Sequence, residues 1–324
     1  MSTASLSPPY VVEDCRGAVQ LLSDGTVRRS PDPIFPVPDA DDGRVEWRDA
    51  QYDPFHDLHL RLYRPRVEEK ERENKKLPVL FYFHGGGFCL GSRTWPNFHT
   101  CCLRLSLSLP AIILSVDYRL APEHRLPAGI DDAAAALLWF QSQSQSDPWL
   151  AQSADLGRVF VSGDSGGGNF THHMAVRFGS AGLAPPIRIR GFILLMPAFG
   201  GTIPTQSELE TPPDAFLTRE MSDRYCRLAL PLGATKDHPI FNPFGPESPS
   251  LAAVEFGKVL VVVAEKDLLR DAGRNYAARL KEMGKKVELV EFDKEQHAFF
   301  VLDPWSESSN EVVRIVKRFV DEEV

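Results

Sequence analysis

The chain has 324 residues, 43% of them hydrophobic and 25% charged, and a formal net charge of −8. These values are typical of one large globular domain and exclude a wholly disordered chain, a collagen and a coiled coil. The acidic balance, without a block of lysine and arginine, argues against a nucleic-acid partner. The longest uninterrupted apolar run, 133–140, is too short for a membrane span, which needs about 20 residues. No protein partner is indicated by the sequence.

The cysteines and the first residues suggest where the protein resides. The five cysteines are odd in number, scattered and without a Cys-x-x-Cys pair, which argues against a disulfide framework and against structural zinc. His56 and His59 have no evident carboxylate partners at metal-ligand spacing, so we expect no metal. No basic segment followed by an apolar stretch begins the chain, so we expect no signal or transit peptide. We therefore expect a cytoplasmic location, with the nucleus as an additional one.

Apolar segments alternate with helical patterns along most of the chain. A hairpin that turns at Asp24 and Gly25 is expected over 18–28. Further strands are expected at 45–49, 58–63, 77–83, 111–117, 158–162, 189–196, 258–264 and 287–292, and helices at 130–141, from the glycines after 165 to 178, at 218–230 and at 307–322. Near-continuous apolar strands that alternate with helices indicate an α/β fold with a mostly parallel sheet, covered on both faces.

Two proline-rich segments interrupt this pattern. Residues 200–257 lie between two expected core strands and contain one helix-like stretch, while residues 1–40 precede the regular region. We therefore expect a single domain over 1–324 in which these two segments, called the lid segments below, cover the end of the sheet.

A short glycine-rich sequence, 163–167, fits the pattern G-x-S-x-G around Ser165. An apolar strand comes directly before it and a helix directly after it, which is the context of the nucleophile elbow in α/β-hydrolases. A phosphate-binding turn is the alternative, but no lysine follows the glycines. The same letters surround the nucleophile of trypsin-like proteases, whose histidine and aspartate precede the serine in a disulfide-linked β-barrel. The α/β pattern and the cysteines argue against that protease reading.

A second motif, 84–87, reads His-Gly-Gly-Gly and follows the strand that ends at Phe83. Acyl transfer requires backbone N–H groups directed at the developing oxyanion, and glycines allow the close approach. Gly86 and Gly87 are the expected donors, together with Gly166, the residue after the nucleophile. Two motifs in this order on consecutive α/β units are far more specific than either motif alone.

In this fold the acid and then the histidine follow the serine in the chain. His297 comes a few residues after the last expected strand, so it is the expected base. Asp267 lies in the loop after the preceding strand and is favoured as the acid over Asp271, which would sit in the first turn of the next helix. His172 and His173 lie in the helix after the elbow and are interpreted as structural.

Five segments together resemble the hormone-sensitive-lipase-type α/β-hydrolases, and more narrowly the plant carboxylesterases. They are HGGGF at 84–88, DYRLAPEHRLPA at 117–128, GDSGGGN at 163–169, EKDLLRD at 265–271 and QHAF at 296–299. The resemblance covers about residues 10–322. Four more segments resemble a plant subgroup associated with strigolactone hydrolysis: VEDCRG from 12, HLRLYRP from 59, GSRTWPNFH from 91 and LALPLGATKDHPIFNPFGPESPSL from 228.

The resemblance implies a serine carboxylesterase that hydrolyses a small apolar ester or lactone without a metal or an organic cofactor, with strigolactone as one candidate substrate. The same family includes gibberellin receptors, which by this resemblance lack the triad histidine, and His297 is present here. It also includes hydroxyisoflavanone dehydratases and alkaloid cyclases. Because fold and site residues do not fix the reaction, a non-hydrolytic lyase or cyclase stays open.

Aromatic residues beside the motifs and in the lid segments are candidates for the substrate pocket. The candidate walls are Phe88, Tyr118, Phe199, Phe216 and Phe241. In or next to the lid segments, an apolar roof over Ser165 is expected from Tyr10, Phe35, Phe199, Phe216, Phe241 and Phe244. The alternative is that these side chains only attach the lid segments to the body of the protein.

Overall fold

The structure is a computed structural model that describes residues 8–30, 32, 35, 37, 41–66 and 76–322. Residues 1–7 and most of 31–40, which belong to the first expected lid segment, lie outside the described residues.

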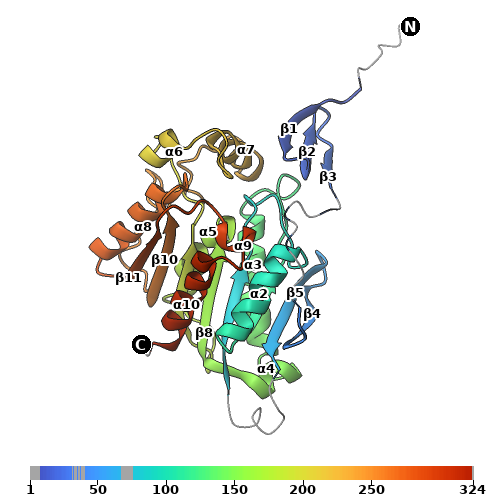
Figure 1. Ribbon diagram of the computed structural model, residues 1–324, viewed down its shortest axis with the longest axis vertical. Helices are drawn as coiled ribbons and strands as arrows, with labels where there is room; N and C mark the ends of the chain where they lie inside the picture. The colour runs from blue at the N-terminus through green and yellow to red at the C-terminus, as the bar shows by residue number, and fades with distance from the viewer. Residues whose placement is uncertain are drawn as a thin grey trace.

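An eight-stranded sheet forms the centre of the molecule (Figure 1). Its strand order is β11-β10-β9-β8-β6-β7-β5-β4. The strands are β4 (Val45–Asp53), β5 (Leu58–Pro65), β6 (Leu77–Phe83), β7 (Ile112–Val116), β8 (Ala154–Asp164), β9 (Ile189–Leu195), β10 (Lys258–Ala264) and β11 (Lys286–Phe292). The pairs from β7 through β11 are parallel, whereas β5 runs antiparallel to both β7 and β4. The prediction of a mostly parallel sheet is confirmed.

Helices cover both faces of this sheet, as parallel strands require. One apolar layer contains α3 (Ala128–Gln143), α5 (Gly166–Phe178) and α8 (Arg270–Glu282), and the other contains α2 (Pro96–Ser108), α9 (Phe299–Leu302) and α10 (Glu307–Asp321). Figure 1 shows α2 and α10 on the near face of the sheet. Side chains of β6 alternate between the layers, since Phe81 packs in the first and Leu80 and Tyr82 in the second. The short α4 (Pro148–Ser153) leads into β8.

The described parts of the two lid segments lie beyond one end of the sheet (Figure 1). The first contains a three-stranded antiparallel sheet of β1 (Val11–Cys15), β2 (Val19–Leu22) and β3 (Val27–Arg29), which includes the expected hairpin. The second contains α6 (Gln206–Glu210) and α7 (Arg219–Ala229). Glu13 of β1 accepts from Arg227 of α7 at 2.6 Å, so the two segments contact each other directly.

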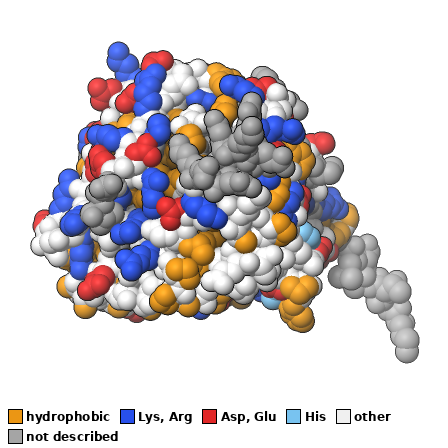
Figure 2. Space-filling model, turned by 90° about the horizontal axis from the view of Figure 1, so that it is seen from below, with side chains coloured by type: hydrophobic (Ala, Val, Ile, Leu, Met, Phe, Trp, Pro, Cys, Tyr) orange, Lys and Arg blue, Asp and Glu red, His pale blue; other side chains and the backbone are white. Residues whose placement is uncertain are grey.

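Two features of the described part of the molecule are the distribution of its charged side chains and the apolar character of its helices. Figure 2 shows basic and acidic side chains interspersed on the end of the molecule seen from below in Figure 1. Across the residues that the structure describes, no helix combines the length and the apolar character needed to cross a bilayer.

Candidate active site

Ser165 occupies a sharp turn between β8, which ends at Asp164, and α5, which begins at Gly166. Its φ of 52° and ψ of −116° are sparsely populated for a residue with a side chain. A Cβ atom at Gly167 would overlap the carbonyl oxygen of Phe83, and one at Gly163 would overlap the carbonyl oxygen of Gly167. The glycines therefore let the strained turn pass close to β6, and the turn holds the serine at the end of the sheet.

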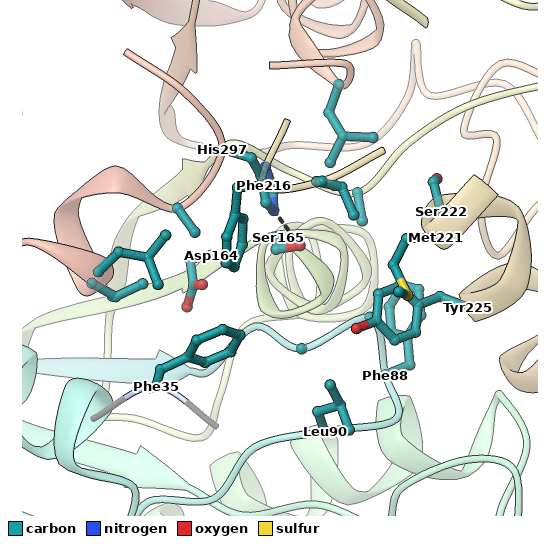
Figure 3. A pocket seen from close by; sticks show the side chains of 18 of the residues that line it. Phe35, Phe88, Leu90, Asp164, Ser165, Phe216, Met221, Ser222, Tyr225 and His297 are labelled. Carbon is teal, nitrogen blue, oxygen red and sulfur yellow. Dashed lines mark hydrogen bonds between the residues drawn. The ribbon is translucent and has the colours of Figure 1, made fainter. Parts of the chain in front are cut away.

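The structure brings Ser165, His297 and Asp267 into one hydrogen-bonded row (Figure 3). His297 Nε2 lies 2.9 Å from Ser165 Oγ, and His297 Nδ1 lies 2.7 Å from Asp267 Oδ2. All three residues are buried, at 7%, 4% and 2% exposed in that order, so solvent competes little for these bonds. A carboxylate can only accept, so Nδ1 carries the proton and Nε2 is left to accept from the serine hydroxyl.

The loops after β10 and β11 supply the acid and the histidine, where the sequence predicts them. Asp267 Oδ1 accepts from the backbone N–H of Leu269 at 2.9 Å, which fixes the carboxylate. Asp271, the rejected candidate, accepts instead from the backbone N–H of Ser207 and pairs with Arg270 at 2.8 Å. Its contacts therefore join α8 to α6 and do not involve the histidine.

The loop after β6 carries two of the expected oxyanion donors. Gly86 and Gly87 line the cavity beside Ser165 and have φ angles of 114° and 59°, which favour glycine. Within the described chain, their N–H groups donate to no protein acceptor, while the carbonyl of Gly86 accepts from Leu90 N at 2.9 Å. Gly166 opens α5, where a helix leaves its first N–H groups free for a ligand.

Asp164, which the sequence reasoning did not single out, ties this loop to the elbow. One carboxylate oxygen accepts from the hydroxyl of Tyr82 at 2.6 Å and from the backbone N–H of Gly85 at 2.9 Å. Burial raises the pKa of Asp164 to about 6, although both hydrogen bonds act to lower it. In the sequence, only its position next to the nucleophile could have indicated that Asp164 belongs to the site.

A mostly apolar cavity of about 70 Å³ opens beside Ser165. Three of the five predicted wall residues line it, namely Phe88, Phe216 and Phe241. Wall residues that the sequence reasoning did not place include Leu90, Trp95, Asn97, Leu217, Met221 and Tyr225. Figure 3 shows Phe88, Met221 and Tyr225 on one side of Ser165 and Phe35 and Phe216 on the other.

The other two predicted wall residues lie outside this cavity, which corrects their assignment. The ring of Tyr118 stacks on His84 with centroids 4.4 Å apart, and its hydroxyl donates to the carbonyl of His84 at 2.7 Å. Phe199 packs on Tyr276 at 4.7 Å and lines a separate cleft of about 350 Å³. Phe244 lines that same cleft.

The roof of the cavity is only partly the one expected. The ring of Phe216 stacks beside His297, with centroids 6.4 Å apart, and Phe35 packs on Phe216 at 5.4 Å. Arg16, from the turn between β1 and β2, covers the outer side of Phe216 at 4.6 Å and donates to its carbonyl. Tyr10, by contrast, is 66% exposed and lies outside the cavity lining.

His56 is the histidine that tests whether a metal-ligand cluster is present. His56 does have carboxylate neighbours, since ligand atoms of Asp53, His56 and Asp132 lie within 4.8 Å of one another. The guanidinium of Arg119, however, bonds Asp132 at 2.7 Å and contacts His56 Nε2 at 3.1 Å, so a positively charged side chain already contacts two of these three residues.

His172, which the sequence analysis interprets as structural, contacts the Tyr276 hydroxyl at 2.9 Å and is buried. Burial lowers its pKa.

Comparison with known proteins places this geometry in a family. The sequence profile of the family described as the alpha/beta hydrolase fold matches residues 80–301. The chain belongs to this family. It is 33% identical to probable carboxylesterase 2 of Arabidopsis thaliana over 97% of this chain and 95% of that protein. It is 36% identical to the gibberellin receptor GID1A of the same plant, over 85% and 81% of the two chains.

Solved structures of an esterase and a carboxylesterase share the fold. The hyperthermophilic esterase from Pyrobaculum calidifontis matches with a TM-score of 0.71 and 30% identity, covering 88% of this chain and 86% of that one. The carboxylesterase EstE1 from a metagenomic library matches with a TM-score of 0.72 and 28% identity over 85% and 88% of the chains. The predicted α/β-hydrolase fold and the resemblance to plant carboxylesterases are confirmed, and the relatives support the expectation of a carboxylic ester hydrolase.

The expected cytoplasmic or nuclear location is wrong by the same comparison. Tuliposide A-converting enzymes 1 and 2 of Tulipa gesneriana, each 38% identical over 80% of this chain, are named chloroplastic. Tuliposide A-converting enzyme b1 of the same plant is named amyloplastic. Both names refer to plastids. The chain spans 66% of the length of tuliposide A-converting enzymes 1 and 2. The expectation depended on the scattered cysteines and on finding no pattern of a signal or transit peptide. The cysteines distinguish a reducing compartment from an oxidising one but not the cytosol from a plastid.

Proposed function

We propose that the protein is a serine carboxylesterase that acts through Ser165, His297 and Asp267. The observation that carries the proposal is the pair of bonds from His297, at 2.9 Å to the serine hydroxyl and at 2.7 Å to the buried carboxylate. This arrangement fixes the tautomer in which the imidazole can remove the proton of the hydroxyl. The free N–H groups in the oxyanion loop support the same proposal, because they are the donors that acyl transfer requires.

The proposed reaction has two steps. In the first, His297 takes the proton of Ser165 while the oxygen attacks an ester or lactone carbonyl, and the oxyanion is bound by Gly86, Gly87 and Gly166. The alcohol oxygen takes the proton that His297 holds. The alcohol of an ester leaves, that of a lactone stays attached to the acyl group, and in both cases an acyl-enzyme remains. In the second step, His297 removes a proton from water, which attacks the acyl-enzyme, and His297 returns that proton to Ser165 Oγ as the acid is released. The steps draw only on side chains and backbone groups of this chain.

We propose a compact, apolar, ring-containing ester or lactone as the substrate class. Aromatic and aliphatic side chains dominate the cavity wall, and aromatic rings from both lid segments meet over His297. Together with the motif resemblance, this favours a strigolactone-like butenolide, attacked at its lactone carbonyl. A plant hormone is a known ligand class on this fold, since relatives include gibberellin receptors.

Hydrolysis of p-nitrophenyl acetate by the wild-type protein and by Ser165→Ala tests the esterase proposal. We expect the variant to lose at least about 10³-fold in kcat while its circular dichroism is unchanged. Near-normal turnover by a folded variant would refute the serine mechanism. A synthetic strigolactone, measured in parallel, tests the finer proposal, and an untouched lactone would refute that part alone.

The reaction product distinguishes an esterase from a lyase or cyclase and from a receptor. One relative is a 2-hydroxyisoflavanone dehydratase from Glycyrrhiza echinata, 32% identical over 98% of this chain. A hydrolase places one oxygen from H₂¹⁸O in the released acid, whereas a lyase or cyclase places none and a receptor releases no product. Mass spectrometry of the product therefore decides among the three.

A further inference from the structure

One polar residue in the wall of the Ser165 cavity has unused hydrogen-bonding groups. Asn97 lines the cavity and is 0% exposed. Neither Oδ1 nor Nδ2 of its carboxamide has a hydrogen-bond partner in the described part of the chain. An unpaired buried polar group costs about 1–3 kcal/mol, so almost every such group in a folded protein has a partner. The proposed mechanism does not use this residue.

The position of Asn97 suggests what that partner is. It is the second residue of α2, two positions after Trp95, whose ring packs on Phe35 with centroids 6.2 Å apart. Phe35 in turn packs on Phe216 at 5.4 Å, and Phe216 lies beside His297. A line of aromatic rings thus connects the neighbourhood of the carboxamide with the catalytic histidine. Because Ser165 and Asn97 line the same cavity, a ligand held at the nucleophile can also contact the carboxamide.

We propose that Asn97 is a specificity-determining residue that donates a hydrogen bond from Nδ2 to a second carbonyl oxygen of the substrate, remote from the carbonyl that is attacked. This inference rests on the proposed esterase function and narrows its substrate class to esters and lactones with a further oxo group. In apolar pockets, a few polar side chains fix the orientation of the ligand. Because the carboxamide is fully buried, an ester without the second oxygen leaves it unpaired and is disfavoured.

The same helix offers a matched control. Thr100 lies one turn further along α2, is 1% exposed, and its hydroxyl also lacks a partner in the described chain. It is, however, absent from the cavity lining. A water molecule held by Asn97 and Thr100 is the competing explanation, and under it the two side chains have only a structural role.

The test compares p-nitrophenyl 4-oxopentanoate, 5-oxohexanoate and 6-oxoheptanoate, each beside the plain alkanoate of the same length. For the wild-type protein we expect kcat/KM for at least one oxo ester to exceed that of its plain partner by about tenfold. Asn97→Leu should bring this ratio to about one, whereas Thr100→Val should leave it unchanged. A wild-type ratio near one for all three pairs, or an unchanged ratio in Asn97→Leu, would overturn the proposal. A lowered melting temperature with an unchanged ratio would assign Asn97 a structural role and also overturn it.

Plain esters keep this test separate from the esterase proposal. Their hydrolysis, and its loss in Ser165→Ala, reports on the catalytic function alone. If no ester is hydrolysed, the same pairs are compared by calorimetric Kd with the wild-type protein and with Asn97→Leu. A preference for the oxo ester that disappears in Asn97→Leu supports the subsite even without turnover, and equal affinities for both members of every pair refute it.

Discussion

Replacing Asp267 by asparagine tests the proposed triad most sharply, because the surrounding hydrogen bonds dictate how the new side chain is oriented. Asp267 Oδ1 accepts from the N–H of Leu269, and Oδ2 accepts from His297 Nδ1. An asparagine keeps its oxygen toward Leu269, since only an oxygen can accept that bond, and so turns its NH₂ group toward the histidine. Nδ1 must then accept, and the proton moves to Nε2, where it blocks removal of the Ser165 proton.

The expected cost is therefore that of a wrong tautomer, about 10³–10⁴-fold in kcat, or about 4–5.5 kcal/mol. The matched control is Asp271→Asn, which removes the charge that pairs with Arg270 and Arg274 but keeps an oxygen that can accept from the N–H of Ser207, and it should change kcat by less than about threefold. The assay is steady-state hydrolysis of p-nitrophenyl acetate, with thermal unfolding as the check on folding. A folded Asp267→Asn protein that keeps more than a tenth of the activity would refute the reasoning, as would a larger loss in Asp271→Asn.

Three further outcomes follow from the site. Gly86→Ala should lower kcat by about 10²-fold or more, because its Cβ would overlap the Leu90 carbonyl and displace an oxyanion donor; unaltered kcat would contradict this role. Asp164 has a folded pKa raised from 3.8 to about 6, so the stability it contributes is full below about pH 4 and is lost as the pH rises through 6. The Asp164→Asn variant lacks this dependence. Its unfolding free energy relative to wild type, measured by denaturant titration, should therefore rise by on the order of 3 kcal/mol between pH 4 and 7. A difference that does not change with pH would contradict the raised pKa of Asp164. Phe216→Ala opens the roof beside His297 and should raise the ratio of kcat/KM for p-nitrophenyl octanoate to that for the acetate by at least about fivefold. The same ratio in the variant and in the wild-type protein would contradict this role of Phe216.

The central strands could be predicted from the sequence because parallel strands that are buried on both faces are continuous apolar runs. The runs at 77–83 and 258–264 coincide with β6 and β10 residue by residue. The order of Ser165, Asp267 and His297 along the chain was equally informative, because each follows the end of a core strand and parallel strands end on the same edge of the sheet.

The cavity wall could not be predicted in this way, because side-chain direction depends on tertiary contacts. Tyr118 and Phe199 lie close to core strands in sequence, yet their rings pack on His84 and Tyr276 outside the cavity. Asp164 adjoins the nucleophile, but its bond to the oxyanion loop joins residues that are 79 positions apart. Likewise, nothing in the sequence around Asn97 indicates that its carboxamide is buried without a partner.

The size of the cavity limits how the proposed substrates can reach Ser165. The cavity is partly open, and its volume of about 70 Å³ is smaller than the roughly 150 Å³ that accommodates benzene in a protein core, so a ring-containing ester must extend through the mouth or displace the roof. One attachment of the roof is Glu13, whose carboxylate pairs with Arg227 at 2.6 Å and with Arg224 at 3.0 Å. Of these two arginines, only Arg227, 54% exposed, forms the kind of surface pair that contributes about 0–1 kcal/mol. Breaking the pair with Arg227 alone costs little compared with the binding energy of an apolar ligand. The apolar surface of Phe35 and Phe216 that opening exposes is covered again when the ligand binds, so the ligand itself offsets most of the cost of its own entry.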